Sequence, residues 1–216
     1  MKLLNSFGPN PRAVRMALIE KGIDIEFVEH DILGGENRAE AYSKKNPGAQ
    51  MPALELDDGT VFGETTTICE YLDEKHPTPA LIGATAEERA NTRQWIRRVE
   101  LGITEHMYNG FRYAEGIDIF RDRMVVIPEA ADGLKAKAAD ARKWLDGQIG
   151  GRDFIAGDKL TFADIILFCC TDFAKGVGQP IESNLENLTA WSDRMGARPS
   201  AKASLHPAAE QVNMQG

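Results

Sequence analysis

The chain has 216 residues, a formal net charge of -8 and basic residues scattered along its length. This length accommodates one large domain or two small ones, and the charge pattern argues against binding to nucleic acid or to an anionic membrane surface. No stretch approaches the ~20 uncharged apolar residues that cross a bilayer. The apolar part of residues 1–5 is too short for a signal peptide.

The cysteines, the histidines and the absence of several motifs limit the kinds of site that the chain can form. The three cysteines cannot all pair with one another and none belongs to a C-x-x-C pair, which predicts reduced thiols and a cytoplasmic location. The four histidines lack the spacing of metal ligands, so we expect no metal. The chain also lacks a G-x-G-x-x-G, a Walker A and a G-x-S-x-G sequence, the signatures of dinucleotide binding, of P-loop phosphate binding and of a serine nucleophile.

The first elements in chain order predict a β-α-β unit. Residues 2–5 form a candidate strand, and a loop rich in proline and glycine follows at residues 6–11. Pro11 suits the first turn of a helix, and Lys21-Gly22 is typical of a helix end. Residues 25–30 alternate in polarity and predict a second strand. A helical crossover between two strands implies that the strands are parallel. A polar loop and a short helix at residues 39–45 follow.

The stretch from residue 46 to residue 72 predicts strand, hairpin, strand and helix, with Asp57-Asp58-Gly59 at the turn. Pro52 belongs at a strand entrance or edge, and a cis bond before it would turn the backbone of Met51 outward. Thr65 is a candidate N-cap for the following helix. The free N–H groups of that helix, beside Glu64, suit the zwitterionic end of an amino acid. An ordinary hairpin and capped helix, with no ligand, is the alternative.

The composition changes after residue 76. Pro77-Thr78-Pro79 predicts a stiff linker, and no convincing strand follows. We expect helices over residues 86–111, over residues 117–149 with an interruption near Pro128, and from Phe162 onward. Thr161 and Asp164 have the spacing of a capping box ahead of a helix that is apolar all round.

These elements predict an α/β part followed by an all-α part. The expected boundaries are residues 1–77 for the first domain, 78–86 for a linker and 87–216 for the helical domain.

Four motifs resemble those of soluble glutathione transferases, and the resemblance extends over most of the chain. They are SFGPNPRAVRMAL at residues 6–18, NPGAQMPALEL at 46–56, ETTTICEYL at 64–72 and FIAGDKLTFAD at 154–164. The resemblance implies a thioredoxin-like N-terminal domain, a C-terminal helical-bundle domain and, as is usual in the family, a homodimer. It also implies glutathione as the co-substrate.

The same resemblance implies roles for individual residues. Met51, before a cis Pro52, would pair its backbone with the cysteinyl part of glutathione. Glu64 and Thr65 would hold the γ-glutamyl end. Further candidates, for the glycyl carboxylate, are Lys45 and Arg38.

Glutathione must react as a thiolate, and a hydrogen-bond donor near a helix N-terminus would favour that form. Many family members use tyrosine, serine or cysteine in the loop before the first helix, but this loop has no tyrosine, so the chain does not resemble a tyrosine-dependent class. We favour Asn10 as the donor, with Ser6 second and Arg12 adding positive potential. The alternative is that backbone N–H groups and the helix dipole suffice.

The expected electrophile pocket has five residues: Phe7, Tyr108, Phe111, Arg112 and Tyr113. Aromatic residues at this helical spacing are also typical of a core with a solvated face. The predicted function is conjugation of glutathione to a small hydrophobic electrophile, a detoxification reaction. The alternatives are a glutathione-dependent disulfide reductase or peroxidase, and a non-catalytic glutathione-binding protein on the same scaffold.

Overall fold

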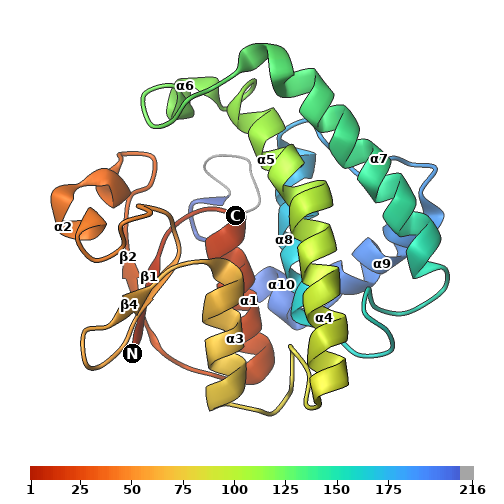
Figure 1. The fold of residues 1–216 in the computed structure, drawn as a ribbon, viewed down its shortest axis with the longest axis horizontal. Coiled ribbons are helices and arrows are strands. Elements are labelled where there is room, and N and C mark those ends of the chain that lie inside the picture. The colour runs from red at the N-terminus through yellow and green to blue at the C-terminus, as the bar shows by residue number, and fades with distance from the viewer. Residues whose placement is uncertain (210–216) are drawn as a thin grey trace.

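The computed structural model describes residues 1–209 and consists of a small mixed sheet with its helices, followed by a helical bundle (Figure 1). Residues 210–216, which belong to the predicted helical domain, lie outside the described part. The elements of the first part are β1 (Lys2–Asn5), α1 (Pro9–Lys21), β2 (Glu26–Glu29), the 3-10 turn η1 (Glu36–Arg38), α2 (Glu40–Ser43), β3 (Ala53–Glu55), β4 (Val61–Phe62) and α3 (Thr65–Lys75).

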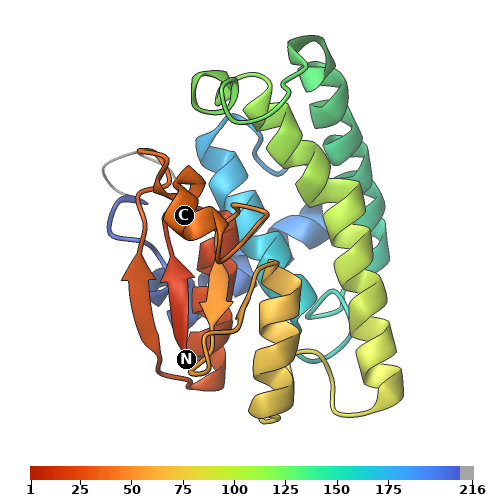
Figure 2. The same cartoon turned by 60° about the vertical axis from the view of Figure 1, so that its left-hand side comes forward.

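The four strands have the order β2-β1-β3-β4. Strands β1 and β2 are parallel, which confirms the β-α-β unit, and β3 pairs antiparallel with both β1 and β4. In Figures 1 and 2, α1 and α3 cover the side of the sheet that faces the helical bundle. This arrangement leaves α1 between the sheet and the bundle, and most of its residues are buried.

The second part is all-helical, as predicted. Its elements are α4 (Ala86–Val99), the π-helical turn η2 (Glu100–Thr104), α5 (Glu105–Arg112), α6 (Ile117–Phe120), η3 (Pro128–Ala130), α7 (Ala131–Ile149), α8 (Phe162–Gly176), α9 (Glu186–Gly196) and α10 (Pro199–Ala203). The expected long helix from residue 86 is the continuous run α4-η2-α5. The expected helix from residue 117 is short at first and resumes only after Pro128, because the chain loops between α6 and η3.

Helix α8 begins with the predicted capping box. Thr161 and Asp164 form both of its hydrogen bonds, and Asp164 also accepts from the backbone N–H of Ile155 at 2.8 Å and from Nε1 of Trp191 at 3.0 Å. The helix is buried on nearly every side and packs against α1 and α4. It therefore forms the centre of the core and holds α1 against the bundle. Among residues 1–209, no helix combines the length and apolar composition that crossing a membrane requires.

Helix α3 ends at Lys75 and α4 begins at Ala86. The connecting segment is tied to the first part by Asp73, whose carboxylate accepts from the backbone N–H groups of Leu81 and Ile82 and from Lys21. The boundaries 1–77, 78–86 and 87–216 remain a prediction.

Candidate functional site

Two cavities adjoin one another between the sheet and the helical bundle. The first, called the polar cavity, is lined from the first part by Asn10, Gln50, Met51, Pro52, Glu64 and Thr65, and from the bundle by Arg97, Glu100, Leu101, Thr104, Glu105, Tyr108, Arg112 and Ile166. The second, called the apolar cavity, is lined by Phe7, Gly8, Pro9, Asn10, Pro11, Ile32, Leu33, Gln50, Met51, Tyr108, Phe111, Arg112, Ile119, Phe120, Arg123 and Phe173.

Five residues line both cavities: Asn10, Gln50, Met51, Tyr108 and Arg112. They mark the place where a molecule in the polar cavity meets a molecule in the apolar one. Each part of the chain contributes to this shared boundary, so the site exists only when the bundle is packed against the first part.

The start of α1 leaves few backbone donors facing this boundary. Pro9 and Pro11 have no N–H group, and the N–H of Arg12 already donates to the carbonyl of Gly8 at 3.0 Å. Within residues 1–209, the backbone N–H of Asn10 has no hydrogen-bond partner. At this helix end, Asn10 is therefore the residue whose backbone N–H is free to donate to a ligand.

The side chain of Asn10 is held by the helical bundle. The hydroxyl of Tyr108 on α5 donates to Oδ1 of Asn10 at 3.3 Å. Desolvation raises the pKa of Tyr108 well above its usual value of 10.0, so the phenol stays protonated at neutral pH and remains a donor. With Oδ1 engaged, Nδ2 of Asn10 has no partner among the described residues. The amide therefore offers its N–H groups at the boundary of the two cavities.

The peptide bond between Met51 and Pro52 is cis, as the resemblance implied. The side chain of Met51 is buried, and its backbone N–H and C=O have no hydrogen-bond partner within residues 1–209. Because buried backbone groups are nearly always paired, these two groups suit an extended peptide as partner.

Glu64 and Thr65 stand at the start of α3. Glu64 is the N-cap and Thr65 is the first helical residue, so the predicted cap was wrong by one position. Glu64 has φ 65° and ψ 115°, a conformation that costs a non-glycine residue on the order of 1–3 kcal/mol and is concentrated at functional sites. No side chain caps the helix, which leaves the first N–H groups free beside an exposed carboxylate.

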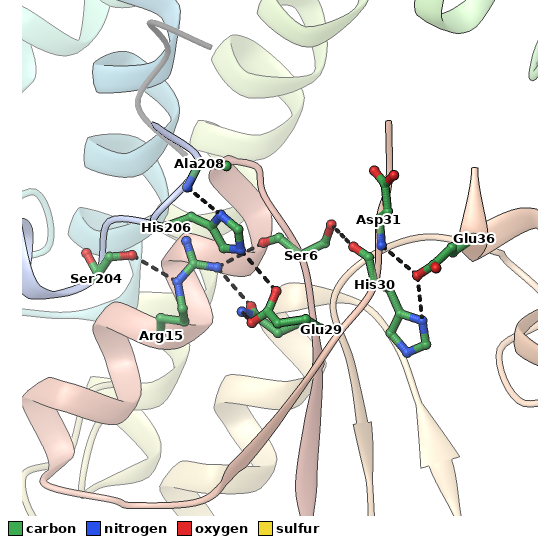
Figure 3. A network of polar contacts seen from close by, with 10 residues as sticks. Ser6, Arg15, Glu29, His30, Asp31, Glu36, Ser204, His206 and Ala208 are labelled. Carbon is green, nitrogen blue, oxygen red and sulfur yellow. Dashed lines mark hydrogen bonds and ion pairs between the residues drawn. The ribbon is translucent and has the colours of Figure 1, made fainter. Parts of the chain in front are cut away.

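The geometry does not support Ser6 as a donor to a thiol. Its side chain is 1% exposed, and its hydroxyl donates to the backbone carbonyl of His30 at 2.6 Å. Figure 3 shows the network around it, in which Arg15 donates to the carbonyls of Ser6 and Ser204. Burial lowers the pKa of Arg15 to about 10, and this arginine still carries its charge at neutral pH. Ser6 therefore joins the ends of β1 and β2 and faces neither cavity.

Arg12 is likewise placed away from both cavities. Its side chain is 2% exposed, and its guanidinium donates to Asp172 at 2.6 Å and to the carbonyl of Ala201 at 3.0 Å. These contacts tie α1 to α8 and α10. The positive potential predicted for Arg12 is thus largely offset by the carboxylate beside it.

Three further predicted residues do not line either cavity. Lys45 is exposed and pairs with Glu55 at 2.8 Å, Arg38 is exposed, and Tyr113 lies beyond the end of α5. By contrast, the structure brings Phe7, Tyr108, Phe111 and Arg112 together in the lining of the apolar cavity.

The sequence interpretation missed several lining residues. Gln50 could have been predicted from the sequence, because it directly precedes Met51 in the motif at residues 46–56. Ile32, Phe120 and Phe173 come from three separate segments and share no local signal. No group of three or more His, Cys, Asp and Glu residues within positions 1–209 has the arrangement of a metal site.

A thioredoxin-like domain packed against a helical domain, with two adjoining cavities between them, defines the class of this protein. A family model of the glutathione S-transferase N-terminal domain matches residues 6–80, and one of the C-terminal domain matches residues 127–199. The chain belongs to the glutathione S-transferase family.

Comparisons with individual proteins support the same family. The chain is 32% identical over 205 residues to glutathione S-transferase 2 of Saccharomyces cerevisiae, covering 92% of this chain and 86% of that protein. A glutathione S-transferase domain-containing protein of Marinobacter aquaeolei VT8 superposes with a TM-score of 0.87 at 36% identity, covering 93% of this chain and 99% of that one. Gtt2 of Saccharomyces cerevisiae also superposes with a TM-score of 0.87 at 31% identity, covering 95% of this chain and 100% of the Gtt2 chain.

Proposed function

We propose that this protein is a glutathione transferase that binds glutathione, stabilises its thiolate and conjugates it to a small hydrophobic electrophile. The observation that carries the proposal is the position of Asn10. Its amide lies at the shared boundary of the polar and apolar cavities and is held there by Tyr108.

Glutathione would occupy the polar cavity. Its cysteinyl backbone would pair with the free N–H and C=O of Met51, and its γ-glutamyl carboxylate would accept from the N–H groups at the start of α3. The ammonium of the same residue would pair with Glu64. Lys45 is engaged with Glu55, so a role for it at the glycyl end would require that ion pair to break. Arg38 lines neither cavity, so its side chain would have to move to reach the glycyl carboxylate.

The thiol would then lie at the boundary beside Asn10. A free thiol with a pKa of about 8.5 is only about 3% ionised at pH 7, and lowering that pKa by one unit raises the fraction to about 24%. The Asn10 amide and its backbone N–H would donate to the sulfur, and the dipole of α1 would favour the negative charge.

The reaction follows from this placement. The thiolate sulfur attacks an electrophilic carbon held in the apolar cavity and forms a C–S bond. In a substitution, a leaving group departs with its bonding pair. In an addition, the π pair of a carbon–carbon double bond moves to the neighbouring atom, which then takes a proton from solvent. The aromatic and aliphatic walls, among them Phe7, Phe111 and Phe173, would hold an apolar electrophile.

The test is a titration of thiolate absorbance for glutathione bound to wild type and to Asn10→Ala. Loss of a hydrogen bond to a charged group costs about 1.5–3 kcal/mol, so we expect the bound thiol pKa to rise by roughly one unit or more. Asn91→Ala is the matched control, since Asn91 donates to the carbonyl of Ala156 and lines neither cavity. Superimposable titrations of wild type and Asn10→Ala would remove Asn10 from the mechanism.

A disulfide reductase or peroxidase is the second candidate. Chemistry through a thiol of the protein itself has little support, because Cys69, Cys169 and Cys170 are all buried and burial raises the pKa of each. Relative turnover of a chloronitroaromatic and of a glutathionyl mixed disulfide would separate the two enzyme classes. Absence of turnover with both, together with glutathione binding, would favour a non-catalytic binding protein.

We also propose that the protein is a homodimer in the cytoplasm and acts in detoxification. The dimer follows the family resemblance, and exposed apolar side chains such as Leu101 and Trp144 on the helical bundle are groups that a second copy would cover. The proposed location rests on the three free cysteines. Sedimentation equilibrium gives the mass in solution, and a monomer mass would contradict the dimer.

A further inference from the structure

Arg112 occupies an unusual position within the site. It is the last residue of α5, lines both cavities, and its guanidinium carbon lies 5.7 Å from the ring centre of Tyr108 and 5.5 Å from that of Phe120. A permanent cation is thus held between two aromatic rings at the place where the sulfur would meet its electrophile.

Most of the hydrogen-bonding capacity of Arg112 is unused. One N–H donates to Oδ1 of Asn109 at 3.1 Å, and Asn109 in turn donates to Glu105 at 2.7 Å. Arg112 makes no ion pair of its own with a carboxylate of residues 1–209. The carboxylate of Glu105 reaches it only through the Asn109 amide. Four of the five guanidinium N–H groups therefore remain available to a ligand.

Arg123, the other cation of the apolar cavity, provides a contrast. Its two terminal nitrogens donate to the carbonyls of Ile32 and Leu33, each at 2.7 Å. These bonds fasten the segment after α6 to the loop after β2. Arg123 is therefore committed to the structure of the wall, whereas Arg112 is not.

Within residues 1–209, the apolar cavity, unlike the polar cavity with its three glutamates, has no negative charge in its lining. The described residues around the apolar cavity include aromatic rings, aliphatic side chains and two arginines, but no carboxylate. A cation that is partly shielded from water by apolar walls attracts an anion more strongly than an exposed cation does. The planar fork of arginine also matches the two oxygens of a carboxylate.

We propose that the apolar cavity selects electrophiles that carry an anionic group, a carboxylate above all, and that Arg112 binds that group. This inference rests on the proposed transferase function and assigns a substrate class to it. The apolar walls hold the body of the electrophile, and Arg112 holds the carboxylate, which orients the reacting carbon toward the sulfur beside Asn10.

A pair of chloroarenes of similar shape, one with an anionic carboxylate and one with a neutral carboxamide at the same position, tests the assignment. The probes are 4-chloro-3-nitrobenzoate and its neutral carboxamide. In both, the thiolate sulfur forms a bond to the ring carbon that carries chlorine, the C–Cl bond breaks, and chloride leaves with the electron pair. The thiol proton passes to the buffer. Each enzymatic kcat/KM is divided by the rate constant for free glutathione thiolate, which removes the intrinsic difference in reactivity.

The measured quantity is the ratio of these normalised values, benzoate over benzamide. We expect wild type to favour the benzoate and Arg112→Met to lower the ratio about tenfold or more, which corresponds to about 1.4 kcal/mol. Arg112→Lys keeps the charge and should retain part of the preference. Arg121→Met is the matched control, because Arg121 is exposed, pairs with Asp118 and lines neither cavity.

Other outcomes overturn the assignment. The proposal fails when wild type shows no preference for the benzoate, or when Arg112→Met keeps the wild-type ratio. It also fails when that variant raises KM for glutathione equally with both probes at a constant ratio, since Arg112 would then bind glutathione. If neither chloroarene is turned over, the transferase function fails. The role of Arg112 is then decided separately, by calorimetric binding of the two S-aryl glutathione conjugates to wild type and to Arg112→Met. The proposal fails if the substitution weakens binding of both conjugates equally or of neither.

Discussion

Replacing Tyr108 by phenylalanine removes a single oxygen atom from the boundary between the two cavities. The ring and its contact with Arg112 are retained, while Oδ1 of Asn10 loses its donor. If the phenol serves to orient the Asn10 amide toward the sulfur, the loss must appear in the ionisation of bound glutathione, before any electrophile is present.

The magnitude follows from the geometry of the bond. A neutral hydrogen bond contributes about 0.5–1.5 kcal/mol net, and the separation of 3.3 Å between the Tyr108 hydroxyl and Oδ1 places this bond at the weak end. A contribution of roughly 0.5 kcal/mol corresponds to about 0.4 pKa unit. We therefore expect Tyr108→Phe to raise the thiol pKa by about 0.4 unit or less, clearly below the change in Asn10→Ala.

A double-mutant cycle separates orientation from a general effect of the substitution. Thiolate absorbance is titrated on wild type, on each single variant and on the double variant, all saturated with glutathione. Tyr108→Phe should shift the pKa in the wild-type background and leave it unchanged in the Asn10→Ala background. Equal shifts in both backgrounds would refute the reasoning, because Tyr108 would then act without Asn10.

Two predictions concern the contacts that hold the domains in place. Asp73→Asn should lower the free energy of unfolding by about 3–5 kcal/mol. The Lys21 side chain is 1% exposed and its ammonium lies 2.6 Å from the Asp73 carboxylate, so the substitution would leave it buried without a charged partner. Urea denaturation measures the change, and a loss below about 1 kcal/mol would contradict this reasoning. Burial acts to raise the pKa of Glu20, but hydrogen bonds from Arg198 and Ser200 and the Arg198 charge lower it below 4.5. The contribution of Glu20 is thus complete above pH 4.5 and lost as pH falls through the folded-state pKa. The stability advantage of wild type over Glu20→Gln should therefore shrink in acid, and a gap independent of pH would exclude this linkage.

Local signals determined most of the fold. Proline at the start of α1, glycine after its end, and the Thr161–Asp164 spacing each act within one turn of chain, so the sequence predicts them directly. The sequence also predicts the hairpin around Gly59 and the parallel pairing of β1 and β2, because a helical crossover between two strands implies parallel strands. Met51 and Glu64, which line the polar cavity, also lie within a single stretch of sequence, so local signals were enough to select them as candidates.

Only the tertiary structure distinguished the candidate donors of the first loop. Ser6, Asn10 and Arg12 stand within seven positions of one another, and all carry suitable groups. Their partners come from far along the chain: the carbonyl of His30 for Ser6, Tyr108 for Asn10 and Asp172 for Arg12. Local spacing holds no information about these partners, since they are brought together by the packing of the sheet, α5 and α8. The sequence by itself determined which groups were available, and the packing decided which of them was left free to meet a ligand.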